Sequence, residues 1–278
     1  MKTQTSRYFY SVYVITCLVL IISPASAGQK PYPFEAADSK DVRAMRNADA
    51  VFLQIKADAK SPVSIPRLAA PLRSMHWAGH EKVAGLTLKP GTDAWEIHWK
   101  DRPDDALTLV LEFDAEPLLI SEIKPIKSSG DGSFYIPAHL AVTRGNNLRY
   151  EPQPKKNTVG YWVDEADFAV WTIDLEKPGR FNVAVLQGCG RGQGGSKTWL
   201  WFHHWLENGT ITPEPQVKID FDVLETGHFQ NFQWVHIGEA ELTEVGNTRI
   251  EVSPNEIKKA ALMDIRAIHL IRLPDKEK

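Results

Sequence analysis

Alternation of apolar and polar residues with a period of two is the feature of this sequence that most constrains its fold. Turn-forming pairs such as Pro178-Gly179 and Asn208-Gly209 separate the alternating runs, which include Trp95-Ile97-Trp99, Leu107-Leu109-Leu111-Phe113, Trp171-Ile173-Leu175, Phe181-Val183-Val185 and Val217-Ile219-Phe221-Val223. Successive side chains of a strand point to opposite faces of a sheet, so this pattern buries one face. Helical periodicity is scarce. The sequence therefore predicts an all-β protein made of antiparallel β-sandwiches.

A polar, glycine-rich stretch divides the strand-rich part of the chain in two. Residues 125–132 contain the run Lys127-Ser128-Ser129-Gly130-Asp131-Gly132, which is typical of a flexible linker. We predict one β-sandwich domain over residues 38–124 and a second over residues 133–274. Residues 28–37 are expected to form a loose leader before the first domain.

The first 27 residues have the pattern of a secretion signal. Lys2 and Arg7 give a positive start, residues 12–22 form an apolar stretch, and Ala25-Ser26-Ala27 is a small-residue cleavage site. The apolar stretch is much shorter than the roughly 20 residues of a transmembrane helix. We therefore expect cleavage near Ala27, a secreted or periplasmic protein, and no membrane span.

Cysteine content, charge and aromatic content narrow the function further. Removal of the signal would leave Cys189 as the only cysteine, which excludes an intrachain disulfide and favours a small buried residue over a nucleophile. The formal charge of −3 and the isoelectric point near 6.3 give nucleic-acid binding no support. All nine tryptophans lie after Met75. This much aromatic surface indicates a large core, a stacking platform for a ligand, or both.

Several motifs resemble parts of cofactor or metal sites but lack the required context. Residues 190–195 fit G-x-G-x-x-G, yet a dinucleotide site needs a helix next, and residues 197–202 form an aromatic run that favours a strand. The adjacent His203 and His204 would point to opposite faces of a strand and do not easily share a metal ion. A glycosidase carboxylate pair cannot be recognised from spacing alone. We expect no catalytic residue and no cofactor.

The order of several motifs in the second block resembles the carbohydrate-binding-module-like jelly roll appended to many bacterial α-L-fucosidases. The motifs are Gly145-Asn146-Asn147-Leu148-Arg149-Tyr150-Glu151, Val159-Gly160-Tyr161-Trp162, Asp167-Phe168-Ala169-Val170-Trp171, Glu225-Thr226-Gly227-His228-Phe229 and Leu262-Met263-Asp264-Ile265-Arg266. The resemblance implies a galactose-binding-like jelly roll over residues 133–274. More weakly, Leu72-Arg73-Ser74-Met75-His76-Trp77 resembles the β-sandwich behind the fucosidase barrel. No stretch resembles the barrel itself, so the resemblance implies a non-catalytic accessory region.

The resemblance also implies where a sugar would bind. In related modules, one aromatic residue precedes a Gly-Asp-Trp-like strand and another lies in a Thr-Gly-x-aromatic loop. The apolar C–H face of a pyranose stacks on such rings, while nearby polar groups bond its hydroxyls. The matching rings are Tyr161, or its neighbour Trp162, and Phe229, with His228, Gln230 and Asn231 as polar neighbours. The alternative that these rings belong to the core is equally open.

The calcium site of such modules has no clear counterpart in this sequence. Residues 136–140 of the matching first strand carry no carboxylate, and the last-strand position falls on Arg266, although Asp264 lies nearby. Calcium takes six to eight oxygen ligands, so we expect no tightly bound metal ion.

The leading functional hypothesis is a secreted, non-catalytic carbohydrate-binding protein. Its partner would be a glycan or polysaccharide, and a glycoside hydrolase is a candidate protein partner. The alternative is a structural or protein-interaction β-sandwich protein of the periplasm or cell surface without a sugar ligand. An enzyme of unrecognised type has the least support, because no catalytic constellation is visible.

Overall fold

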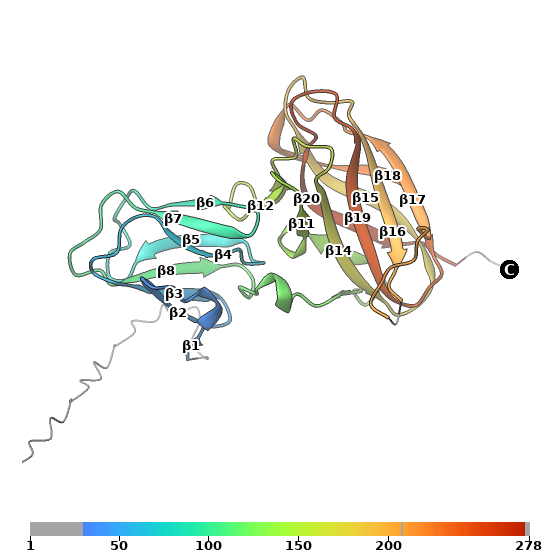
Figure 1. Ribbon diagram of the computed structural model, residues 1–278. Helices are drawn as coiled ribbons and strands as arrows, with labels where there is room; N and C mark the ends of the chain where they lie inside the picture. Colours follow the sequence, from blue (N-terminus) through green and yellow to red (C-terminus); the bar gives the residue numbers. More distant parts are fainter. Residues whose placement is uncertain (1–29, 207, 276–278) are drawn as a thin grey trace, which may run out of the picture.

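The computed structural model describes residues 30–206 and 208–275, which form two β-sandwich domains (Figure 1). Within these residues the only helical elements are three 3-10 turns, η2 (Glu35–Ala37), η3 (Ile120–Glu122) and η4 (Ala138–Leu140). The prediction of an all-β protein with antiparallel sheets is therefore confirmed. No helix in this part of the chain is long and apolar enough to cross a membrane. The predicted signal lies outside the described residues.

The first domain pairs a five-stranded sheet with a three-stranded sheet. The five-stranded sheet has the order β1 (Tyr32–Pro33), β2 (Val42–Arg46), β3 (Ala50–Ile55), β8 (Thr108–Phe113) and β5 (Leu72–Trp77). The smaller sheet has the order β4 (Val63–Pro66), β7 (Ala94–His98) and β6 (Thr87–Pro90). The alternating residues point between the sheets, where Trp95 lies against Phe113 with a centroid distance of 6.5 Å. Burial of these rings holds the two sheets together.

The second domain packs two larger sheets face to face. One, called here the β20 sheet, has the order β12 (Arg149–Glu151), β13 (Thr158–Gly160), β20 (Asp264–Arg272), β15 (Gly179–Cys189) and β18 (His228–Leu242), and β10 (Phe134–Pro137) also pairs with β20. The other has the order β11 (Val142–Arg144), β14 (Phe168–Leu175), β19 (Gly246–Glu256), β16 (Lys197–His204) and β17 (Val217–Asp222). Fully buried rings fill the space between them: Phe134, Tyr150, Trp162, Trp171, Phe181 and Phe202.

The segment expected to be a loose leader is partly built into the first domain. Tyr32 and Pro33 pair with β2, and both Phe34 and Ala37 are buried in the core. The guanidinium of Arg46 lies 4.4 Å from the centroid of the Phe34 ring. Two paired strand residues and two buried side chains anchor the segment, which is too few to form a recognisable alternating pattern.

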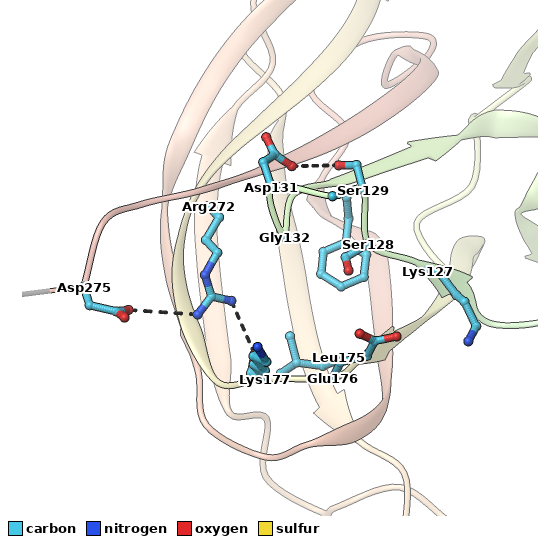
Figure 2. Close-up of a pocket in the computed structure, with 12 residues that line it drawn as sticks. Lys127, Ser128, Ser129, Asp131, Gly132, Leu175, Glu176, Lys177, Arg272 and Asp275 are labelled. Carbon is cyan, nitrogen blue, oxygen red and sulfur yellow. Dashed lines mark hydrogen bonds and ion pairs between the residues drawn. The ribbon is translucent and has the colours of Figure 1, made fainter.

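The expected linker belongs to the second domain from Ile126 onward. Ile126 and Lys127 form β9, which pairs in parallel with β14 and is the one parallel strand pair in the described residues. Figure 2 shows that the following residues continue along the end of this domain, where the Ser129 hydroxyl donates to Asp131 at 2.8 Å. Arg272 closes the other side of a pocket of about 540 Å³ and donates to Pro178 O at 2.7 Å. The segment is therefore a docked connection rather than a flexible linker.

The two domains also contact each other directly, along a seam near β6 and β12 (Figure 1). The Leu72 amide donates to Pro152 O at 2.9 Å, and the Gln153 side-chain amide donates to Leu88 O at 3.1 Å. Arg67 of the first domain is buried 5.3 Å from the Tyr150 ring centroid of the second, and burial lowers its pKa to about 10. Arg67 Nη2 also donates to His139 O at 3.4 Å, so this buried guanidinium contacts the second domain at both Tyr150 and His139.

Candidate functional site

Tyr161 is the predicted ring that reaches solvent. It follows directly after β13, and 47% of the residue is exposed. The Arg149 guanidinium, from β12, lies 3.2 Å from the ring centroid, and the Lys156 ammonium lies at 5.7 Å. A cation over an aromatic ring is attracted by the ring's negative face. Tyr161 also has a φ of +60°, a left-handed conformation that is uncommon for residues other than glycine.

Trp162, the alternative ring at this position, lies in the core. It is 0% exposed, and its indole N–H donates to Asp167 O at 2.9 Å. Its backbone carbonyl accepts from the Leu262 amide at 2.8 Å, which ties it to the segment before β20. A buried indole offers a ligand no open face, so only Tyr161 of this pair has the exposure that stacking requires.

The second predicted group, residues 228–231, forms the start of β18. His228 and Asn231 are exposed, whereas Phe229 and Gln230 are half-buried. The Phe229 ring lies against the backbone at Gly190, where an added Cβ would be 2.7 Å from the ring. The Asn231 side-chain amide donates to Thr226 O at 2.5 Å, and His228 Nδ1 accepts from the Gln230 amide at 3.1 Å. These polar groups therefore stabilise their own turn in this structure.

The two predicted groups flank the start of β20 but do not share a pocket. Trp162 is bonded to Leu262, just before β20, while His228 pairs with Cys189 of β15, next to Gly188, which pairs with Asp264 of β20. The pocket around Tyr161 includes none of residues 228–231. The structure thus places Tyr161 and Phe229 on the same region of the domain as separate surfaces.

Tyr161 borders a pocket between the two domains, which we call the seam pocket. It has a volume of about 520 Å³. The first domain contributes residues 87–90 and His98, and the second contributes Arg149, Glu151, Gln153, Lys156 and Tyr161. Such a volume is ordinary for a small-molecule site, and domain interfaces are frequent locations for them.

A carboxyl group with an unusual pKa lies near Glu151, which lines this pocket. Burial raises the pKa of Asp264 to about 8, and the neighbouring Glu151 carboxylate is the second-largest cause of the increase. A Cβ on Gly160 would be 2.7 Å from Asp264 Oδ1 and 3.3 Å from Glu151 Oε2, so glycine leaves room for both carboxyls. Glu151 is paired with Lys156 at 2.6 Å. Asp264 is only 6% exposed and therefore not open to a bound sugar.

An exposed cluster of rings that the sequence analysis missed lies on the outer face of the β20 sheet. Tyr135 of β10 and Trp234 of β18 are 53% and 47% exposed, with ring centroids 6.4 Å apart. His269 of β20 lies 6.2 Å from Tyr135 and 5.8 Å from Trp234. We call these three residues the ring cluster. Trp234 is the only exposed tryptophan, since the other eight are buried or half-buried.

Strand parity is the signal that reveals this cluster. Tyr135 stands between the core residues Phe134 and Ile136, and His269 stands between Ile268 and Leu270. Alternation therefore places both rings on the face opposite to the core. In β18 the ring of Trp234 also points to solvent, although the strand begins with the half-buried Phe229 and Phe232. An aromatic residue on the polar face of a strand is thus a stronger functional signal than an apolar run.

The remaining candidate motifs have structural surroundings. Cys189 is fully buried, and burial raises the pKa of its thiol to about 11, so the reactive thiolate is scarce at neutral pH. Residues 197–204 after the glycine-rich loop form the strand β16 rather than a helix. His203 Nδ1 lies 3.0 Å from Thr212 O. In the part of the chain that the structure describes, no three His, Cys, Asp or Glu residues are grouped to hold a metal ion.

Comparison with known proteins finds similarity to solved structures only. No protein-family model and no curated protein matches the sequence. The α-L-fucosidase from Vibrio sp. strain EJY3 is similar at 11% identity and a TM-score of 0.31, over 82% of this chain and 39% of the fucosidase. The match to CBM35 from Cellvibrio japonicus Abf62 has 14% identity and a TM-score of 0.37, and it spans 50% of this chain and 92% of that module. The match to the C-terminal CBM6 of LamC from Zobellia galactanivorans has 15% identity and a TM-score of 0.38. It spans 50% of this chain and 98% of that module.

Similarities this distant say nothing of what the chain binds. They concern the β-sandwich fold, and the chain spans about two fifths of the fucosidase length. A functional conclusion has to come from the surfaces of the protein itself.

Proposed function

We propose that this chain is a secreted, non-catalytic carbohydrate-binding protein whose second domain stacks a sugar on exposed rings. The observation that carries the proposal is the ring cluster. Tyr135 and Trp234 keep about half of their surface in water, although eight other tryptophans are wholly or partly covered. Large aromatic side chains left together on a surface mark interaction sites, and an aromatic face suits the C–H face of a pyranose.

The surroundings of the cluster support a sugar over a purely apolar ligand. His269 lies beside both rings and offers ring nitrogens that can bond a hydroxyl. The small Ala184 stands opposite both His269 and His236 in the sheet, so no bulky side chain rises between these polar groups. A stack with a few polar neighbours is the common arrangement of ligand sites.

Tyr161 is the second part of this proposal. Its exposed ring keeps the role that the sequence analysis predicted, with Arg149 covering one side of it. Phe229 and the polar residues His228, Gln230 and Asn231 stay predicted contacts, and their local hydrogen bonds would have to open for a sugar. The signal pattern of the first 27 residues supports secretion, and the missing barrel resemblance supports a non-catalytic role.

Removal of a cluster ring tests the function. Trp234→Ala and Tyr135→Ala should each weaken binding of an oligosaccharide identified on a glycan array by about 1–2 kcal/mol, roughly 5- to 30-fold in Kd. Isothermal titration measures the Kd. Tyr32→Ala, which removes a comparably exposed ring from the first domain, should leave the Kd unchanged.

Two results would count against the proposal. If the parent protein binds no glycan on the array, the alternative of a protein-interaction sandwich replaces sugar binding. If glycans bind but Tyr32→Ala weakens them as much as Trp234→Ala, the sugar site is not the ring cluster. Thermal melts of all variants verify the fold, since an exposed ring contributes little to the core.

A further inference from the structure

Arg149 is the cation of the seam pocket that lacks a carboxylate partner among the described residues. Its guanidinium stacks on Tyr161 at 3.2 Å, and its Nε is buried without a hydrogen-bond partner. Lys156 differs, because it is paired with Glu151 at 2.6 Å. A planar guanidinium with unused donors can hold a carboxylate or sulfate through two parallel hydrogen bonds. Stacking on Tyr161 holds the plane of the Arg149 guanidinium in one orientation before a ligand binds.

The pocket concentrates positive charge on an acidic chain. Lys89, Arg149 and Lys156 line it against the single carboxylate Glu151, whereas the whole chain has a formal charge of −3. Glu96 lies just outside, 3.7 Å from Lys89 and 3.1 Å from His98. Exposed pairs of this kind contribute little, so a bound anion can compete for Lys89. Composition alone would not produce this local excess.

A second unused group lies in the same pocket. The Gln153 side-chain amide donates to Leu88 O across the domain seam, but its Oε1 is buried and accepts no hydrogen bond. A buried acceptor without a donor costs free energy until a ligand supplies one. A sugar hydroxyl is such a donor. The pocket therefore offers a guanidinium for an anion at Arg149, a hydrogen-bond acceptor at Gln153 Oε1 and an aromatic ring at Tyr161.

We propose that the seam pocket binds an acidic saccharide, a sugar whose carboxylate or sulfate pairs with Arg149 and Lys89 while its ring contacts Tyr161. This inference rests on the proposed function, and it names the class of sugar that would bind at Tyr161. Binding of this kind would require both domains, because Lys89 belongs to the first domain and Arg149 to the second. Neither domain alone presents the full set of groups.

Matched sugars test the proposal. Titrations of the full secreted chain would use glucose and galactose, each as the neutral sugar, the uronate and the 6-sulfate, so that only the group on C6 changes. At least one acidic form should bind 10-fold or more tightly than its neutral counterpart, with the preference falling at high salt. The uronate and sulfate arms show which anion the pocket prefers.

Variants assign the preference to the pocket. Arg149→Gln should abolish the preference for the acidic form, Arg149→Lys should retain part of it, and Lys89→Gln on the other domain should reduce it several-fold. Lys82→Gln removes an exposed lysine outside the pocket and should change nothing. Equal binding of acidic and neutral sugars, or a preference that survives Arg149→Gln in a folded protein, would overturn the inference.

The same measurements separate this inference from the proposed function. Binding of neutral glycans that depends on Trp234, without any preference for acidic forms, would leave the function standing and remove the acidic ligand. A preference that depends on Arg149 but not on Trp234 would locate sugar binding at the seam pocket instead of the ring cluster. Absence of binding by every saccharide tested would remove both.

Discussion

At the scale of single residues, the backbone of Tyr161 is the clearest departure from ordinary geometry. An L-residue in the left-handed conformation costs about 1–2 kcal/mol, whereas glycine adopts it freely. Such strain persists where the surroundings hold it, and it is frequent at ligand sites. Arg149 stacks on the ring, and the neighbouring backbone is bonded on both sides, at Gly160 in β13 and at Trp162 O to the Leu262 amide.

Glycine and alanine at this position should therefore differ in stability. Tyr161→Gly should unfold at a higher urea concentration than Tyr161→Ala, by about 1 kcal/mol in unfolding free energy, although both lose the ring. Tryptophan fluorescence follows the unfolding. Equal stability of the two variants would mean that residue 161 does not keep a positive φ in solution.

Asp264 makes stability depend on pH. Because its folded pKa is raised to about 8, the folded protein keeps this proton at pH values where the unfolded chain has lost it. The resulting stabilisation is complete below the ordinary aspartate pKa near 4 and is lost as the pH rises toward 8. The folded state then has to bury a carboxylate beside Glu151.

Asp264→Asn removes that proton and so should remove this pH dependence. Between pH 5 and pH 8.5 the unfolding free energy of the parent should fall by roughly 2–4 kcal/mol more than that of the variant, since one pH unit of differential protonation corresponds to about 1.4 kcal/mol. Urea melts at the two pH values measure the difference. Parallel curves for parent and variant would show that Asp264 is ionised in the fold.

At the scale of elements, β9 distinguishes a docked segment from a linker. Ile126 packs partly against the core, opposite Ile173 of β14, whereas the neighbouring Lys127 is exposed. Ile126→Ser should lower the unfolding free energy of the second domain by about 1–2 kcal/mol through lost apolar burial. Lys127→Ser, next to it, should leave the melting temperature unchanged. If the two variants melted at the same temperature, the interpretation of residues 125–132 as a flexible linker would be correct after all.

Strand parity explains how much of the candidate site was accessible to sequence reasoning. The alternating runs correctly marked β7, β14, β15 and β17 as strands with one mainly buried face. They also marked β8 as a strand, but β8 is covered on both faces, since Val110 packs with Ala50 and Phe52 on the other side. The same parity places Tyr135 and His269 outside. It does not say that they are neighbours, because β10 and β18 are far apart in sequence and meet through their pairing with β20 and with β15 beside it.

At the scale of the whole molecule, the seam between the domains brings Arg67 of the first domain against His139 of the second. Arg67 is buried there, and burial together with the Arg67 charge lowers the pKa of His139 to about 4, so this histidine is neutral at ordinary pH. The contacts of Leu72 and Gln153 across the seam fix the position of Lys89 relative to Arg149. The seam pocket is thus a property of the assembled chain rather than of either sandwich.

Alternation and turn chemistry act over a few neighbouring residues, so they were sufficient to predict the all-β class and long strands such as β14, β15 and β17. Outside the strands, parity gives no guidance, and there the tertiary packing sets which aromatic faces stay open. Tyr161 and Trp162 are adjacent, yet one is half exposed and the other fully covered. Their difference depends on what packs above each ring: Arg149 and the first domain at Tyr161, and the interior near Asp167 at Trp162. Such contacts join residues distant in sequence, and no local pattern encodes them.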